Sequence, residues 1–154
     1  MKLSPPYEIK LMKGFADLPF GSQPSMAVEL FGEPEDKEEI KEDLLNDHSL
    51  VYHYWELGFS LFFNCNNNFA FSCAEIDANG LLFNKPVFNL NEKDILELFS
   101  KNGYKASETE MQEWGEKRIS FDEIQLDLYF QNNKLSSINF GLFPEDSGYI
   151  YFPN

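Results

Sequence analysis

The chain has 154 residues, and its 12 basic and 26 acidic side chains give a formal net charge of −14. Such a chain is repelled by phosphate backbones and by anionic lipid surfaces, so we expect neither nucleic acid nor a membrane among its partners. Aromatic residues make up 16% of the sequence, which excludes a disordered acidic tail and indicates a folded domain.

The N-terminal stretch MKLSPPYEIK contains no apolar run of about 7–15 residues, so the sequence predicts no signal peptide. Nowhere does an apolar run approach about 18 residues, the length of a membrane span. The two cysteines, Cys65 and Cys73, suit a reducing compartment. Together these features predict a cytoplasmic protein.

The first predicted helix covers about Ser25 to Phe31, where apolar residues recur at the spacing of one helical face. Ser22 and Ser25 offer oxygens for its N-terminal cap, and Gly32 ends it. A variable acidic loop is expected next, over Glu33–Asp47, with eight acids and two Lys and a local charge of −6.

Two interpretations of this acidic segment remain open. It is either a docking surface that attracts a basic partner or a solvated loop that keeps the protein soluble. The acids lack the spacing of a calcium-binding loop, so no metal is expected there. On the docking hypothesis the partner-binding acids are Glu35, Asp36, Glu38, Glu39, Glu42 and Asp43.

Alternation with period two predicts strands over residues 50–55, 59–63 and 71–76, the last two joined by an Asn-rich turn. In the second half of the chain a helix is expected to begin near Asn91, a good N-terminal cap, and to end at Asn102-Gly103. Strands follow over 124–130 and 135–140. Trp114 lies in the polar segment between the helix and these strands and is either a lid over the core or an exposed anchor.

The two halves resemble each other. Residues 28–32 read VELFG and residues 96–100 read LELFS, an offset of 68, while LGFSLFF (57–63) and IQLDLYF (124–130) are offset by 67. The same offset separates Pro19 from Pro86. Shared tracts in the same order favour a duplicated unit.

The sequence therefore predicts an α+β fold of two tandem units, each a helix followed by a three-stranded meander. The units would cover about 14–83 and 84–143 of a single domain 1–154, with a C-terminal tail at 144–154. Side by side they would form one six-stranded antiparallel sheet with both helices packed on one face.

The stretch GFADLPFGSQPSMAVELFGEP (14–34), followed by an aromatic strand over 52–55 and the strand 58–63, resembles the SmpA/OmlA lipoproteins and the β-lactamase-inhibitor-protein-like fold. It is also similar to uncharacterised tandem proteins from bacterial toxin–immunity gene neighbourhoods. The resemblance covers most of residues 14–140. It implies a tandem helix–loop–sheet fold and a role as an inhibitor, an immunity protein or an envelope assembly module.

On the sheet face opposite the helices, alternation is expected to place the partner-binding residues His53, Trp55, Phe62, Asp127 and Tyr129, together with Ser60. Large aromatic side chains mixed with acids are typical of protein-binding surfaces. Alternatively, the apolar C-terminal tail or residues 1–20 cover Trp55 and Phe62.

Nucleotide-binding loops, nucleophile elbows and metal-binding His or Cys spacings are missing from the sequence, so we expect no enzyme, metal or cofactor. His48 and His53 are the only histidines, and His53, in a strand between two tyrosines, is expected to pack structurally. The preferred hypothesis is a non-enzymatic immunity or inhibitor protein that binds a basic protein partner. The alternatives are a small-ligand-binding protein or enzyme with an unrecognised acidic site, and an envelope assembly module.

Overall fold

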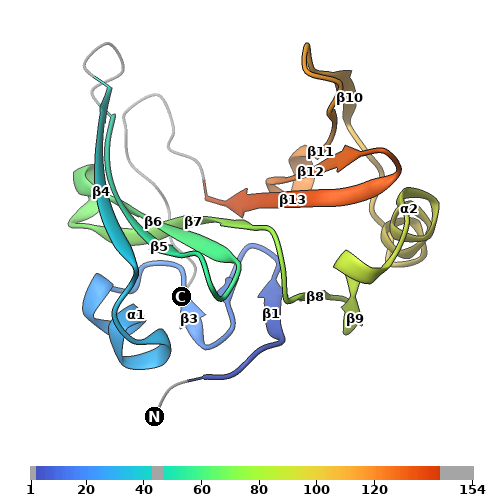
Figure 1. Ribbon diagram of the computed structural model, residues 1–154. Coiled ribbons are helices and arrows are strands. Elements are labelled where there is room, and N and C mark those ends of the chain that lie inside the picture. Colours follow the sequence, from blue (N-terminus) through green and yellow to red (C-terminus); the bar gives the residue numbers. More distant parts are fainter. Residues whose placement is uncertain (1–2, 43–46, 143–154) are drawn as a thin grey trace.

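The computed structural model describes residues 3–42 and 47–142. Within them the chain forms two α-helices, a large and a small β-sheet, and three 3₁₀ turns. Figure 1 shows both helices on the same side of the large sheet, near its opposite ends, with the small sheet between them. The predicted α+β class is thus confirmed.

The large sheet has eight strands, and every neighbouring pair is antiparallel. Its middle is the pairing of β7 with β13, which joins strands from the two halves of the chain. From one edge to the other, the strands are β10 (Glu108–Met111), β11 (Lys117–Phe121), β12 (Leu126–Gln131), β13 (Lys134–Gly141), β7 (Ala70–Ile76), β6 (Phe59–Asn64), β5 (Asp47–Tyr54) and β4 (Asp36–Glu42).

The small sheet consists of a central strand, β1, with one hairpin on each side. The central strand pairs antiparallel with β2 and parallel with β8. Its five strands, in spatial order, are β3 (Leu18–Pro19), β2 (Gly14–Phe15), β1 (Tyr7–Lys10), β8 (Gly80–Leu82) and β9 (Lys85–Pro86). The 3₁₀ turns are η1 (Cys65–Asn67), η2 (Val87–Asn89) and η3 (Asp122–Ile124).

Both helices form where the periodicity predicts them, as α1 (Pro24–Phe31) and α2 (Glu92–Lys101). The Asn91 side chain caps α2 by accepting a hydrogen bond from the Asp94 backbone N–H at 2.9 Å, as expected. The predicted serine cap of α1 is wrong. Gln23 holds the cap position without a side-chain capping hydrogen bond, and Pro24 starts the helix with a preset φ angle.

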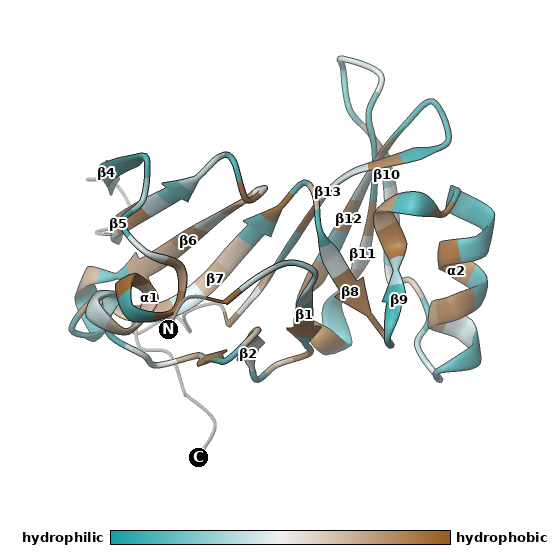
Figure 2. Cartoon of the chain, turned by 60° about the horizontal axis from the view of Figure 1, so that its bottom comes forward, coloured by the Kyte–Doolittle hydropathy of each residue, from teal (hydrophilic) through white to brown (hydrophobic). Residues whose placement is uncertain are grey.

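The hydrophobic core lies between the large sheet and the layer of helices and small sheet. Phe31 of α1 contacts Phe59 with ring centroids 4.9 Å apart, and Phe99 of α2 stacks on Phe121 at 4.4 Å. Tyr7 of the small sheet also contacts Phe59, at 5.3 Å. Figure 2 shows the apolar residues of α2 turned toward the sheet and its polar residues turned away.

The structure corrects two expectations about the sheet. The acidic loop over Glu33–Asp47 is wrong, because Asp36–Glu42 forms the edge strand β4 and pairs with β5 at seven positions. The six-stranded sheet is wrong for the same reason and because β10 forms the other edge. Hydrophobic alternation could not reveal these strands. Ile40 is the only apolar residue of β4, so backbone pairing stabilises the strand instead.

Trp114 is 65% exposed, so it is not a lid over the core. The predicted tail at 144–154 lies outside the described residues, and so does its predicted contact with the sheet. No helix among residues 3–42 and 47–142 is long and apolar enough to cross a membrane.

Candidate protein-binding face

The face of the large sheet opposite the two helices, here called the outer face, carries a row of polar side chains. Residues paired across antiparallel strands point to the same side of a sheet. The pairings connect His53 to Ser60, Ser60 to Glu75, and so on across the sheet. From β4 to β10 the complete row is Asp36, His53, Ser60, Glu75, Asn139, Asp127, Ser120 and Glu108.

The residues that alternate with this polar row point to the helix side of the sheet and form part of the core. Leu126, Phe140, Ala74, Leu61 and Tyr52 are paired in the same way and all are buried against the helices and the small sheet. Neighbouring rows on the outer face contain Phe62, paired with Val51 and Cys73, and Tyr129, paired with Arg118 and Ser137. The structure therefore places the predicted residues His53, Phe62, Asp127 and Tyr129 on the same face of the sheet.

The edge strand β4 separates its charges by side. Asp36 and Glu38 are paired with outer-face residues of β5, and the backbone of Glu42 continues this alternation. Lys37, by contrast, lies on the helix side, with its Nζ 5.2 Å from the centre of the Tyr52 ring. Strand alternation thus leaves acids on the outer face and turns both lysines of β4 away from it.

The same alternation places one of the predicted partner-binding acids on the other side of the sheet. Glu39 is paired with Leu50 and lies on the helix side, where its Oε1 is 3.5 Å from Nζ of Lys41. Glu39 therefore does not share the outer face with Asp36 and Glu38. Asp43 lies outside the described residues.

Trp55 and His53 form an aromatic cluster at the β4–β6 end of the outer face. Their rings stack with centroids 5.2 Å apart and 20° between the planes. His53 Nε2 lies 2.9 Å from Glu38 Oε1, and its Nδ1 lies 2.7 Å from the Ser60 hydroxyl oxygen. Glu35 accepts a hydrogen bond from the Trp55 backbone N–H at 2.7 Å. Trp55 is 62% exposed, so residues 3–42 and 47–142 leave most of its side chain accessible.

A second polar cluster surrounds Arg118 at the other end of the face. Its Nη2 lies 2.6 Å from Glu110 Oε2 and 3.6 Å from Glu108 Oε1. Loss of hydration opposes the charged form of Arg118, but the carboxylates of Glu110, Asp127 and Glu108 outweigh it and raise its pKa. Partial burial, followed by the charge of Asp127, raises the pKa of Tyr129.

The two clusters are distinct. Five inter-strand steps separate His53 in β5 from Arg118 in β11, a distance of about 24 Å at the usual strand spacing. Between them lies Glu75, whose pKa is raised by partial desolvation and then by the charge of Asp77. The structure therefore does not gather the predicted residues into one compact site; it spreads them along the sheet.

The outer face is predominantly negative in the part of the chain that the structure describes. Arg118 is the one cation in the rows above, and Lys134 adds a second positive charge at the turn between β12 and β13. The acids in these rows are Asp36, Glu38, Glu75, Glu108, Glu110 and Asp127.

Sequence reasoning missed three of these acids. Glu75 alternates with buried Ala74 and Ile76, a pattern that was available in the sequence. Glu108 and Glu110 lie in β10, whose four residues are all exposed and show no alternation, so no sequence signal marks them. Nor do the described residues contain a group of three or more His, Cys, Asp and Glu arranged to hold a metal ion.

No protein-family model, curated protein or solved structure matches this chain. The resemblance to the SmpA/OmlA lipoproteins and to the β-lactamase-inhibitor-protein-like fold therefore stays a prediction.

Proposed function

We propose that this chain is a non-enzymatic protein-binding module of the immunity or inhibitor kind, and that its outer face covers a basic surface of a partner protein. One observation carries this proposal: acidic and polar side chains form a row across all eight strands, while both lysines of β4 point to the other side. A face of one predominant sign attracts an oppositely charged partner and orients it before contact.

The dimensions of the face suit a protein partner. Seven inter-strand steps give the row a length of about 34 Å. A standard interface buries about 800 Å² on each partner, which corresponds to a patch roughly 28 Å across. The chemistry also fits, since exposed Trp55 supplies the kind of large aromatic anchor on which binding energy concentrates.

Charge-neutralising variants on the two sides of the sheet test this proposal. The outer-face variant combines Asp36→Asn, Glu38→Gln and Asp127→Asn. The control combines Glu39→Gln, Glu97→Gln and Glu123→Gln, which lie elsewhere on the surface. Both remove three carboxylates and so change the net charge from −14 to −11.

Each immobilised protein is used to capture partners from a lysate of the encoding organism. The proteins retained by the wild type are then purified, and their affinities are measured at several salt concentrations. The outer-face variant should weaken binding and flatten its salt dependence, whereas the control should bind like the wild type. Equal losses in both variants would show that net charge, and not this face, attracts the partner.

We also propose that the fold consists of two tandem units derived by duplication. Along the chain, α1 is followed by the large-sheet strands β4–β7, and α2 is followed by the large-sheet strands β10–β13. A short hairpin precedes each helix; it contains Pro19 before α1 and Pro86 before α2. These elements carry the sequence tracts that repeat. Because the units share one core, hydrogen exchange in β6 and β12 should report a single unfolding event, and two separate events would contradict a single domain.

A further inference from the structure

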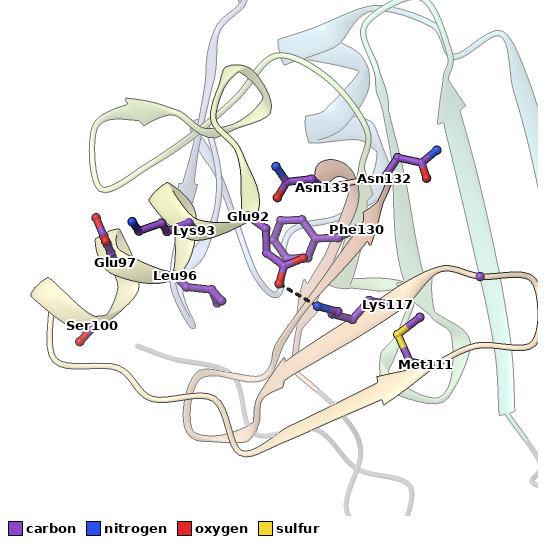
Figure 3. Close-up of a pocket in the computed structure, with 11 residues that line it drawn as sticks. Glu92, Lys93, Leu96, Glu97, Ser100, Met111, Lys117, Phe130, Asn132 and Asn133 are labelled. Carbon is purple, nitrogen blue, oxygen red and sulfur yellow. Dashed lines mark hydrogen bonds and ion pairs between the residues drawn. The ribbon is translucent and has the colours of Figure 1, made fainter.

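A pocket of about 710 Å³ lies between α2 and strands β10–β12, on the helix side of the large sheet. Met111, Lys117 and Phe130 are paired in one row and so reach the pocket together from three adjacent strands. In Figure 3, Leu96 of α2 points toward the same space. This volume falls within the range of small-molecule sites in proteins, and the site is separate from the outer face.

The pocket wall combines apolar surface with balanced charge. Leu96, Phe130 and Met111 provide the apolar part, and Met111 is 62% exposed. The charged residues of the lining are two glutamates and two lysines, Glu92, Glu97, Lys93 and Lys117. Their formal charges cancel, so the pocket as a whole favours neither an anion nor a cation.

An ion pair lies beside the apolar part of the pocket. Lys117 Nζ is 2.9 Å from Glu92 Oε2, and the two side chains are 34% and 20% exposed. In Figure 3 they point toward each other beside the Phe130 ring. This contact uses one of the three N–H donors of the ammonium and part of the acceptor capacity of the carboxylate, so each group can bond a ligand as well.

The position of this ion pair is held by the backbone around it. Glu92 is the first residue of α2, and its N–H donates to the Asn133 carbonyl oxygen at 3.2 Å. Asn91 caps the same helix end through its side chain. Lys117 is held in register between Met111 and Phe130. A ligand would therefore meet the two charges in a prepared arrangement, which lowers the entropy cost of binding.

We infer that this pocket binds a free α-amino acid with a large apolar side chain. The carboxylate of such a ligand accepts hydrogen bonds from the Lys117 ammonium, and its ammonium donates to the Glu92 carboxylate. The ammonium and the carboxylate of the ligand are both bonded to its α-carbon and therefore lie close together. They can align head to tail with the protein's ion pair. The ligand side chain then covers partly exposed Leu96 and exposed Met111 and removes their apolar surface from water, above the buried Phe130 ring.

The charge balance explains why a zwitterion is preferred over a simpler ligand. A ligand with only a carboxylate would satisfy Lys117 but would place its charge beside Glu92, and a ligand with only an amine would meet the reverse problem at Lys117. Burying unlike charges in pairs avoids this repulsion. A partly exposed ion pair such as Glu92–Lys117 contributes little to folding stability, so sharing its bonds with a ligand costs little.

The test uses the full ¹⁵N-labelled chain and amide chemical shifts recorded during titration. L-phenylalanine is added to about 10 mM, which reveals a dissociation constant near 1 mM or below. Phenethylamine lacks the carboxylate, 3-phenylpropanoate lacks the ammonium, and glycine lacks the side chain. L-phenylalanine should shift the amides of Leu96, Met111 and Lys117, and each analogue should bind about tenfold more weakly or not at all.

Two single variants locate the effect. Lys117→Met and Glu92→Gln should each weaken L-phenylalanine binding by about tenfold, whereas Lys101→Met, on the same helix but outside the lining, should not. Three results would overturn the inference: no shifts with L-phenylalanine, equal binding of a singly charged analogue, or shifts confined to the outer face. The analogue series needs only the wild-type chain, so it decides the question even where a variant folds poorly.

Discussion

Replacing Gly141 with alanine should strongly destabilise the protein, because the added methyl group has no space between two paired strands. Gly141 lies opposite Cys73 in the pairing of β7 with β13, which joins the two halves of the large sheet. An added Cβ would lie 2.6 Å from the Cys73 Cα, and closer still to the Cys73 Cβ and the Ser72 carbonyl oxygen. Ordinary contacts begin at 3.4 Å. Because the obstacle is largely main chain, the two strands must move apart.

The magnitude follows from two losses. Overpacking a tight site costs about 2 kcal/mol. Separation of the strands also weakens the hydrogen bond from the Leu142 N–H to the Ser72 carbonyl oxygen, now 2.7 Å, at a cost of about 1 kcal/mol. The expected loss of about 3 kcal/mol is a large part of the roughly 5–15 kcal/mol that stabilises a typical domain. In a chain of this size it lowers Tm by about 6–12 °C.

Urea denaturation followed by circular dichroism measures this loss, and Gly103→Ala provides the matched control. Gly103 has φ +89°, and an added Cβ there would meet no atom within 4 Å, so its substitution costs only the backbone strain of about 1 kcal/mol. Gly141→Ala should therefore lose about 2 kcal/mol more than the control. If Gly141→Ala were as stable as the wild type or as Gly103→Ala, the close approach of β7 and β13 would be wrong.

Three further predictions concern α2 and the outer face. Asn91→Ala should lower the free energy of unfolding by about 1 kcal/mol in urea titrations, since it removes the α2 cap; no loss would contradict the cap. Trp55→Ala should change that free energy by less than about 0.5 kcal/mol, because the side chain is 62% exposed, yet should abolish measured partner binding. In the folded protein the pKa of Glu75 is raised above 4.5, mainly by desolvation. Between its unfolded and folded pKa values, the folded state therefore binds more protons than the unfolded state, and the stability of the protein falls as pH rises. Glu75→Gln should thus raise the urea midpoint at neutral pH, and this gain should vanish on acidification below pH 4.5; a gain independent of pH would contradict the shift.

Periodicity was sufficient to locate the elements with one buried side. The helix expected over Ser25–Phe31 and the helix expected from Asn91 are both present, and buried Leu126, Leu128 and Phe130 alternate along β12 as predicted. These residues are specified locally, because each element must bury one apolar stripe and its spacing records that requirement. The placement of His53 and Asp127 on the same side of the sheet followed from the same rule.

The edges of the sheet could not be predicted in this way. Asp36–Glu42 is too charged to resemble a strand, and Glu108–Met111 has no buried residue. Both become strands because a neighbouring strand offers unpaired backbone groups, and that neighbour exists only in the folded sheet. The pocket beside Glu92 and Lys117 is equally a product of tertiary structure, since residues 25 positions apart form its ion pair.

The sequence by itself therefore determined the α+β class, the two helices, the strands with a buried side and the acidity of the chain. Tertiary structure decided how that acidity is distributed. Pairing in register turned Asp36 and Glu38 to the outer face and Lys37 to the helix side, where its ammonium lies over the Tyr52 ring. The reason is that charge is a property of composition, whereas the side on which a charge lies depends on which residues pair across the sheet.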